Sequence, residues 1–182
     1  MKIVAILAEG FEETEFIAVT DLLRRAKLDV CIVSSTEQLT VTGAHDFKII
    51  ADKLWKDTDL KNADCIFLPG GMPGVTNLQA NKNVVNAVQD FAKNDKYVCA
   101  ICAAPLVLAD ASVLENKKFT CYPSTASEIK TGIYSEDSVV IDGKIITSRG
   151  VGTALDLGLS LVSVFCGKDK AETLRKAVVY GI

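Results

Sequence analysis

A cysteine stands where a buried strand is expected to turn into a helix. In the segment YVCAICAAPLVLA, residues 97–109, an apolar run is interrupted after Cys102 by Ala-Ala-Pro and then resumes. A thiol at such a turn faces the free N–H groups at the start of the helix, and these donors and the helix dipole favour thiolate. We therefore expect Cys102 to have a lowered pKa and to act as a nucleophile. The alternative is that Cys102 only fills the core, as free cysteines often do.

Cys99 and Cys102 form a C-x-x-C motif, which raises the alternatives of a redox pair and a zinc site. In a redox pair both thiols lie near the start of a helix, whereas Cys99 falls inside the expected strand. The chain has no second C-x-x-C and only one histidine, His45, so a zinc ligand set is incomplete. No G-x-G-x-x-G or Walker A pattern that would bind phosphate groups follows the first strand. We expect neither a metal nor an organic cofactor.

Four carboxylates, Glu9, Glu12, Glu13 and Glu15, lie at the start of a predicted helix. Acidic residues there usually compensate the helix dipole, and we expect this of Glu12 and Glu13. Glu15 differs because it borders the apolar stripe of the helix beside Phe16. Burial would raise its pKa and suit it to exchanging a proton with a neighbouring thiol or substrate.

Glycines supply the other chemical signal. Gly70 and Gly71 follow an apolar run and precede Met-Pro-Gly. Such a turn can direct backbone N–H groups at developing negative charge, and the alternative is an ordinary tight turn. The glycines of residues 150–153 are typical of a helix start, and His45, in a loop-like segment, is expected to be solvated.

Strands and helices that would position these residues alternate along the chain. Apolar runs and their periodicity predict strands over 2–7, 29–35, 47–51, 65–68, 97–101 and 118–122, a hairpin over 139–148, and helices over 13–26, 83–93, 103–111, 125–130, 153–165 and 170–179. This alternation indicates a mostly parallel sheet, in which ligands bind beyond the carboxyl ends of the strands. Residues 8–10, residues 69–71 and Cys102 all come directly after a predicted strand.

Length and composition limit the class of protein. A chain of 182 residues favours a single domain over 1–182. The net charge is −3 without a lysine-arginine cluster, so nucleic acid is not expected as the primary partner. The longest apolar stretch is shorter than the ~20 residues of a membrane span, and the N-terminus lacks the features of a signal peptide. Six cysteines without a disulfide pattern suit a reducing compartment, so we expect a cytoplasmic protein with no membrane partner.

Taken together, the segments VAILAEGFEETE, FLPGGMPG, AICAAP and ITSRGVGTALDLGLSLV resemble the DJ-1/ThiJ/PfpI superfamily, most closely its DJ-1 branch. They occur in the family's order and cover most of the chain. The resemblance implies a flavodoxin-like α/β three-layer sandwich with a nucleophile elbow, usually assembled as a homodimer.

The resemblance also assigns roles to matching residues. Cys102 matches the family nucleophile, and Glu15 matches the glutamate that hydrogen-bonds it. The backbone N–H groups of Gly71 and Ala103 match an anion-stabilising pocket that includes Gly70.

Further matches surround this centre. Ser148, Arg149 and Gly150 match a segment beside the site. His45 aligns where some members present an arginine from the neighbouring subunit. Tyr122 departs from the family, because many members carry a histidine there and a phenol with a pKa near 10 is a poor base at neutral pH.

The resemblance implies a cofactor-free enzyme that converts reactive dicarbonyls, methylglyoxal to lactate, in the manner of a glyoxalase III or a protein deglycase. Its substrate would be a small aldehyde or dicarbonyl, or a glycated protein. The alternative is an oxidative-stress sensor or redox-regulated chaperone that works through oxidation of Cys102. An intracellular cysteine protease is a third interpretation, and Tyr122 in place of histidine argues against it.

Overall fold

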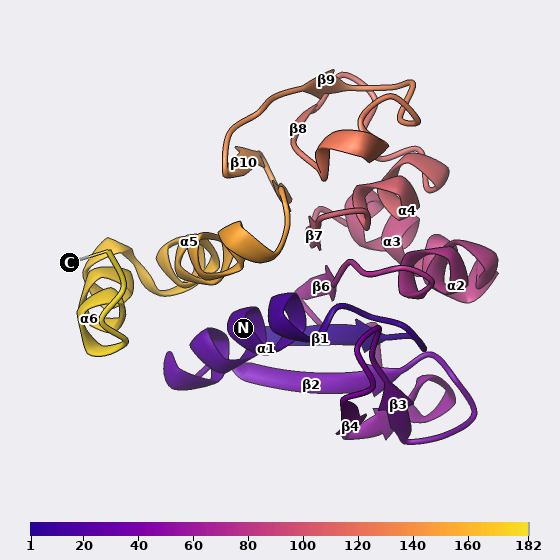
Figure 1. Ribbon diagram of the computed structural model, residues 1–182, viewed down its shortest axis with the longest axis horizontal. Coiled ribbons are helices and arrows are strands. Elements are labelled where there is room, and N and C mark those ends of the chain that lie inside the picture. The colour runs from indigo at the N-terminus through magenta and orange to yellow at the C-terminus, as the bar shows by residue number, and fades with distance from the viewer. Residues whose placement is uncertain (182) are drawn as a thin grey trace.

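A seven-stranded sheet forms the centre of the computed structural model, which describes residues 1–181. Figure 1 shows how the helices are arranged around it. Its strand order is β10-β11-β7-β6-β1-β2-β5, and every pairing is parallel except the hairpin β10–β11. The strands are β1 (Lys2–Leu7), β2 (Asp29–Ser34), β5 (Lys53–Leu54), β6 (Cys65–Leu68), β7 (Tyr97–Ile101), β10 (Val139–Asp142) and β11 (Ile145–Ser148).

Helices cover both faces of this sheet (Figure 1). One apolar cluster packs α1, α5 and α6 against one face, and a second packs α2, α3 and α4 against the other. The helices are α1 (Glu13–Arg25), α2 (Gly74–Ala80), α3 (Lys82–Lys93), α4 (Pro105–Asp110), α5 (Ala154–Cys166) and α6 (Lys168–Ala177). The α/β three-layer sandwich expected from the sequence is confirmed.

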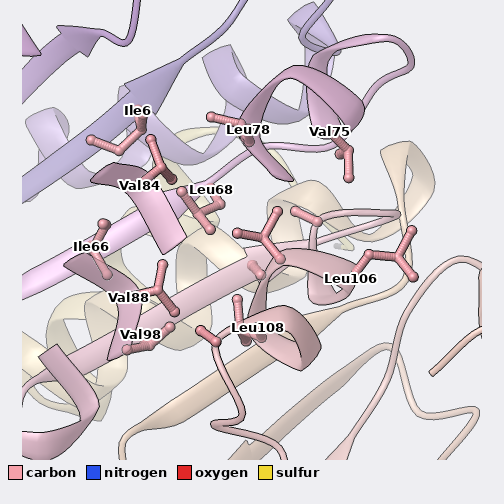
Figure 2. Close-up of a cluster of buried hydrophobic side chains, with 14 of the residues drawn as sticks. Ile6, Ile66, Leu68, Val75, Leu78, Val84, Val88, Val98, Leu106 and Leu108 are labelled. Carbon is pink, nitrogen blue, oxygen red and sulfur yellow. The ribbon is translucent and has the colours of Figure 1, made fainter. Parts of the chain in front are cut away.

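Figure 2 shows the cluster under α2, α3 and α4. Leu68 of β6 and Val98 of β7 point from the sheet toward Val84 and Val88 of α3 and Leu108 of α4, and all five side chains are fully buried. β6 and β7 are therefore covered on both faces, which holds their carboxyl ends in place.

Two short ladders lie outside the central sheet. Strands β3 (Thr40–Thr42) and β4 (Lys48–Ile50) form a hairpin, and β8 (Lys118–Phe119) pairs with β9 (Ile133–Tyr134). Three single 3₁₀ turns complete the described elements: η1 (Trp55–Asp57), η2 (Pro123–Thr125) and η3 (Val151–Thr153). No helix within residues 1–181 is long and apolar enough to cross a membrane.

The segment 118–130 differs from the sequence prediction. The strand expected over 118–122 ends at Phe119 and belongs to the small β8–β9 ladder. The helix expected over 125–130 is wrong, because the N–H groups of Thr125, Ala126 and Glu128 bond to carbonyls three residues back instead of four.

Candidate active site

Cys102 lies where β7 ends, at a sharp elbow in the backbone. Its φ of +63° is in the left-handed region, which residues other than glycine rarely adopt. The Cys102 N–H donates to the Ser148 carbonyl at 3.0 Å, and the Cys102 carbonyl accepts from the Tyr122 N–H at 2.8 Å. These two bonds to β11 and to the turn before η2 hold the strained residue, and α4 begins three residues later with Pro105. The predicted nucleophile elbow is present.

Glu15 reaches Cys102 from helix α1, which Glu12 caps by accepting the Glu15 N–H at 2.6 Å. The Glu15 side chain is completely buried. Its Oε2 accepts the Gly70 N–H at 2.9 Å, whereas Oε1 is buried without a hydrogen-bond partner among the described residues. A methyl group built on Gly150 would lie 3.8 Å from both Oε1 and Cys102 Sγ, so the free oxygen and the sulfur border the same small space.

Burial raises the pKa of Glu15 to about 7, against the lowering effects of the Cys102 side chain and the Gly70 N–H, and the nearby Glu12 charge adds to the rise. At neutral pH both the protonated and the ionised form are therefore populated. A carboxyl group in this condition can both accept and return a proton.

The thiol does not have the lowered pKa that the sequence predicted. Burial and the adjacent Glu15 carboxylate raise the pKa of Cys102 to about 12, and the N–H groups of Ala103 and Gly71 lower it only in part. The local sequence showed the backbone donors but not the burial or the negative charge beside the sulfur. Burial is the largest cause of this rise, and the ionised Glu15 carboxylate adds to it, so protonation of Glu15 removes one of the effects that oppose thiolate.

The backbone N–H groups of Gly71 and Ala103, which the resemblance assigns to an anion-stabilising pocket, both lower the pKa of the Cys102 thiol. Gly71 has a φ of +92°, and a Cβ there would lie 2.3 Å from the Glu12 nitrogen. At Gly70 a Cβ would lie 2.5 Å from Cys102 Cβ and 2.6 Å from Glu15 Oε2. The backbone geometry therefore requires both glycines, and an anion forming near Sγ would meet two N–H donors.

The segment after β11 borders the pair. Ser148 is buried, and its hydroxyl lies 2.7 Å from that of Thr153. Thr153 also accepts the Gly150 N–H at 3.1 Å, so it holds Gly150 beside Cys102. Thr153 was not among the residues predicted from the sequence, because its role depends on Gly150 lying beside Cys102 in the folded chain.

Tyr122 and Arg149 occupy different positions around the site. Tyr122 is 49% exposed, and its ring carbon Cδ2 would be 3.6 Å from a methyl group on Gly150, so it borders the same space as Cys102. Arg149 donates to the Glu136 carbonyl at 3.0 Å and thus holds the loop between β9 and β10.

His45 does not join Cys102 within this chain. Its backbone N–H and its Nδ1 contact the two oxygens of Glu13 at 2.6 and 2.8 Å. This hydrogen bond raises the pKa of the exposed His45, and the His45 contacts lower the pKa of Glu13 despite its burial. Ligand-type atoms of Glu12, Glu13 and His45 lie within 4.8 Å of one another. Glu12 caps α1 and Glu13 lies in its first turn, where a negative charge interacts favourably with the helix dipole, and Glu13 also holds the loop that carries His45.

The volume of a surface cavity does not by itself identify the candidate active site. A hollow of about 440 Å³ lies between Leu60 and Phe91, where it contains neither a cysteine nor a histidine. The chemistry is instead concentrated in the small space around Cys102.

Fold and site together define a class: an α/β protein with a cysteine at a nucleophile elbow and a buried glutamate beside it. The profile of the DJ-1/PfpI family matches residues 1–164, and the chain belongs to that family.

The relatives are DJ-1 proteins. The chain is 35% identical over 98% of its length to protein DJ-1 homolog B of Arabidopsis thaliana, of which it spans 41%. It is 31% identical to the glutathione-independent glyoxalase DJ-1 of Schizosaccharomyces pombe, with 98% of each chain covered. Among solved structures, oxidised Toxoplasma gondii DJ-1 superposes with a TM-score of 0.95 at 28% identity, over 100% of this chain and 99% of that one.

Proposed function

We propose that this chain is a cysteine-dependent enzyme that converts reactive dicarbonyls to 2-hydroxy acids, as in methylglyoxal to lactate, without a cofactor. One observation carries the proposal: the unpartnered Oε1 of a half-protonated Glu15 borders the same space as Cys102 Sγ. The similarity to the S. pombe glyoxalase DJ-1 supports the reaction class.

The first step is attack of Cys102 Sγ on the aldehyde carbon while ionised Glu15 takes the thiol proton. A bond forms between sulfur and C1, and the carbonyl electron pair moves to oxygen. The N–H groups of Gly71 and Ala103, which lower the pKa of the Cys102 thiol, would hold this oxyanion. Glu15 then gives its proton to the oxyanion, which leaves a hemithioacetal and a carboxylate.

The second step moves hydrogen between carbons. Glu15 removes the C1 proton, which gives an enediolate, and returns that proton to C2, while the proton of the C1 hydroxyl passes to the C2 oxygen. C1 is thereby oxidised to a thioester and C2 is reduced to an alcohol, so no external oxidant or reductant takes part. Water then hydrolyses the thioester, which releases lactate and restores the thiol. Glu15 carries the proton transfers to and from carbon in this scheme.

The direct test is lactate formation from methylglyoxal by purified protein without metal or glutathione. Lactate must be measured, because thiols also consume methylglyoxal by forming adducts. We expect Cys102→Ser to lose activity by at least about 100-fold, as loss of a nucleophile generally does. Cys166→Ser, at an exposed cysteine on α5, is the matched control and retains activity. Equal turnover by wild type and Cys102→Ser would exclude the scheme.

Two finer expectations belong to this proposal. Glycated proteins would be a second source of the same dicarbonyl, which release of lactate from methylglyoxal-treated albumin tests. The chain would also form a homodimer, for which light scattering should give twice the chain mass of 19.5 kDa.

A second candidate function uses the same sulfur as an oxidative-stress sensor or the switch of a redox-regulated chaperone. Protonated Glu15 and two N–H donors surround Cys102 Sγ, and these groups would stabilise a sulfinate. Two molecules of hydrogen peroxide would convert the thiol to sulfinic acid and two of water. The T. gondii relative has been solved in an oxidised form. Graded peroxide should add two oxygens at Cys102 first, and earlier oxidation of Cys31 or Cys166 would contradict this role.

A further inference from the structure

Three glycines surround the Cys102–Glu15 pair, and two of them are required by the backbone. A Cβ on Gly70 or Gly71 would lie within 2.6 Å of neighbouring atoms, closer than any side chain tolerates. Their lack of a side chain is therefore explained by packing alone.

Gly150 differs from these two glycines. Its φ of 160° and ψ of −164° describe extended backbone that any residue adopts. A Cβ at this position would meet Tyr122 Cδ2 at 3.6 Å, Cys102 Sγ at 3.8 Å and Glu15 Oε1 at 3.8 Å, which are ordinary contact distances. Neither strain nor a clash excludes alanine, so packing does not explain why the position lacks a side chain.

The position of Gly150 is nevertheless well defined. Its N–H donates to Thr153 Oγ1 at 3.1 Å, and its carbonyl accepts from the Thr153 N–H and hydroxyl, each at 2.9 Å. The space in front of the sulfur is thus held open by fixed backbone, bounded by the sulfur, the carboxyl oxygen and the Tyr122 ring.

We propose that Gly150 is a specificity-determining residue: its missing side chain leaves a methyl-sized gap through which the aldehyde end of a substrate reaches Cys102 and Glu15. This deepens, and for its catalytic part rests on, the proposed function. An attacking sulfur must approach the carbonyl carbon to about 3–3.5 Å. A methyl group already in contact with both Sγ and Oε1 would occupy that approach.

The size of the gap also indicates the substrate class. A single methyl would contact three groups within 3.8 Å, so little width remains for a second carbon substituent beside the reacting carbon. A carbon bearing hydrogen, as in glyoxal and methylglyoxal, fits the gap. Diketones such as 2,3-butanedione, in which both carbonyl carbons carry methyl groups, are disfavoured.

The experiment compares Gly150→Ala with Gly152→Ala, two residues along, where a Cβ would meet nothing within 4 Å. Alkylation of Cys102 by iodoacetamide is followed by peptide mass spectrometry, which distinguishes it from the other cysteines and needs no turnover. We expect Gly150→Ala to slow Cys102 alkylation at least tenfold, and Gly152→Ala to stay within twofold of wild type. Turnover of methylglyoxal should fall in parallel.

The alkylation and turnover results separate the two proposals. Slow alkylation in Gly150→Ala with no turnover by wild type would support the gap and overturn the dicarbonyl function. Wild-type alkylation in a Gly150→Ala protein with an unchanged thermal midpoint would overturn the gap. Should Gly150→Ala fail to fold, Tyr122→Ala widens the gap from its exposed side. It should accelerate the reaction of Cys102 with bulky N-ethylmaleimide, and an unchanged rate would equally overturn the proposal.

Discussion

Cys102 and Glu15 behave as one unit at the scale of residues. Burial and the ionised Glu15 carboxylate together raise the pKa of the Cys102 thiol, the latter because two negative charges in a buried site repel each other. The strained φ of Cys102 costs about 1–3 kcal/mol, which the surrounding hydrogen bonds to Ser148 and Tyr122 offset. The left-handed backbone at Cys102 and the buried carboxyl group of Glu15 together place a sulfur next to an acid.

Replacement of Glu15 tests this unit. Glu15→Gln keeps the shape and can still accept the Gly70 N–H, but it neither gives nor takes a proton. We expect kcat/KM for methylglyoxal to fall by about 10²–10⁴, the usual contribution of a general acid-base. The wild-type pH profile should bend near pH 7, where the Glu15 pKa lies, and the bend should be absent in the variant. An unchanged bend in Glu15→Gln would assign it to another group.

Elements with a clear local pattern of apolar residues were predictable from the sequence. The expected bounds of β1, β6 and β7 match the structure, and those of α3 differ by one residue. Each is fixed by side chains that one face of the element buries, and that pattern is local. Cys102 and Gly71 could be placed for the same reason, because they follow two of these strands.

Short elements could not be predicted in this way. The β3, β5 and β9 strands contain two or three residues each, too few to show a periodic pattern, and β5 pairs with β2, which is not its neighbour along the chain. Helix α2 begins at Gly74 after Met72-Pro73, residues that usually signal a turn. The role of Thr153 and the contact between His45 and Glu13 likewise depend on tertiary placement.

Helix α1 carries Glu15, so its packing against α5 should affect the site. Gly158 of α5 lies against Leu22 of α1, where an added Cβ would be 2.6 Å from Leu22 Cδ1 and 3.2 Å from Leu22 Cβ. We expect Gly158→Val to destabilise the protein by about 1–3 kcal/mol through overpacking, measured by urea unfolding.

A double variant shows whether that cost comes from this contact. Leu22→Ala alone removes a buried side chain and should cost about 2–5 kcal/mol. In Leu22→Ala/Gly158→Val the valine occupies part of the cavity, so the combined cost should be smaller than the sum. Gly152→Val, in open space, is the control and should be near neutral. If the cost of the double variant equals the sum of the two single costs, the destabilisation by Gly158→Val does not come from its contact with Leu22.

At the scale of the whole molecule, the arrangement of the site lowers the stability of the fold. Strands β6, β7 and β11 are adjacent, and their carboxyl ends bring Gly70, Cys102 and Ser148 together at one edge of the sheet. Helix α1 then buries a carboxyl group at that edge, which a structure selected only for stability would avoid. The cost arises when the buried Glu15 carboxyl group ionises, so it should appear in the pH dependence of the free energy of unfolding.

Glu15 has a folded pKa of about 7 against a usual 4.5, so the folded state binds its proton more tightly than the unfolded chain. Stability from this group is therefore complete below pH 4.5 and is lost as the pH rises through 7. A shift of this size corresponds to about 3 kcal/mol. Glu15→Gln should match wild type at pH 4 and exceed its free energy of unfolding by up to about 3 kcal/mol at pH 8, measured by urea titration. Because Gln carries no charge, a constant difference between pH 4 and pH 8 would mean that folding does not raise the pKa of Glu15.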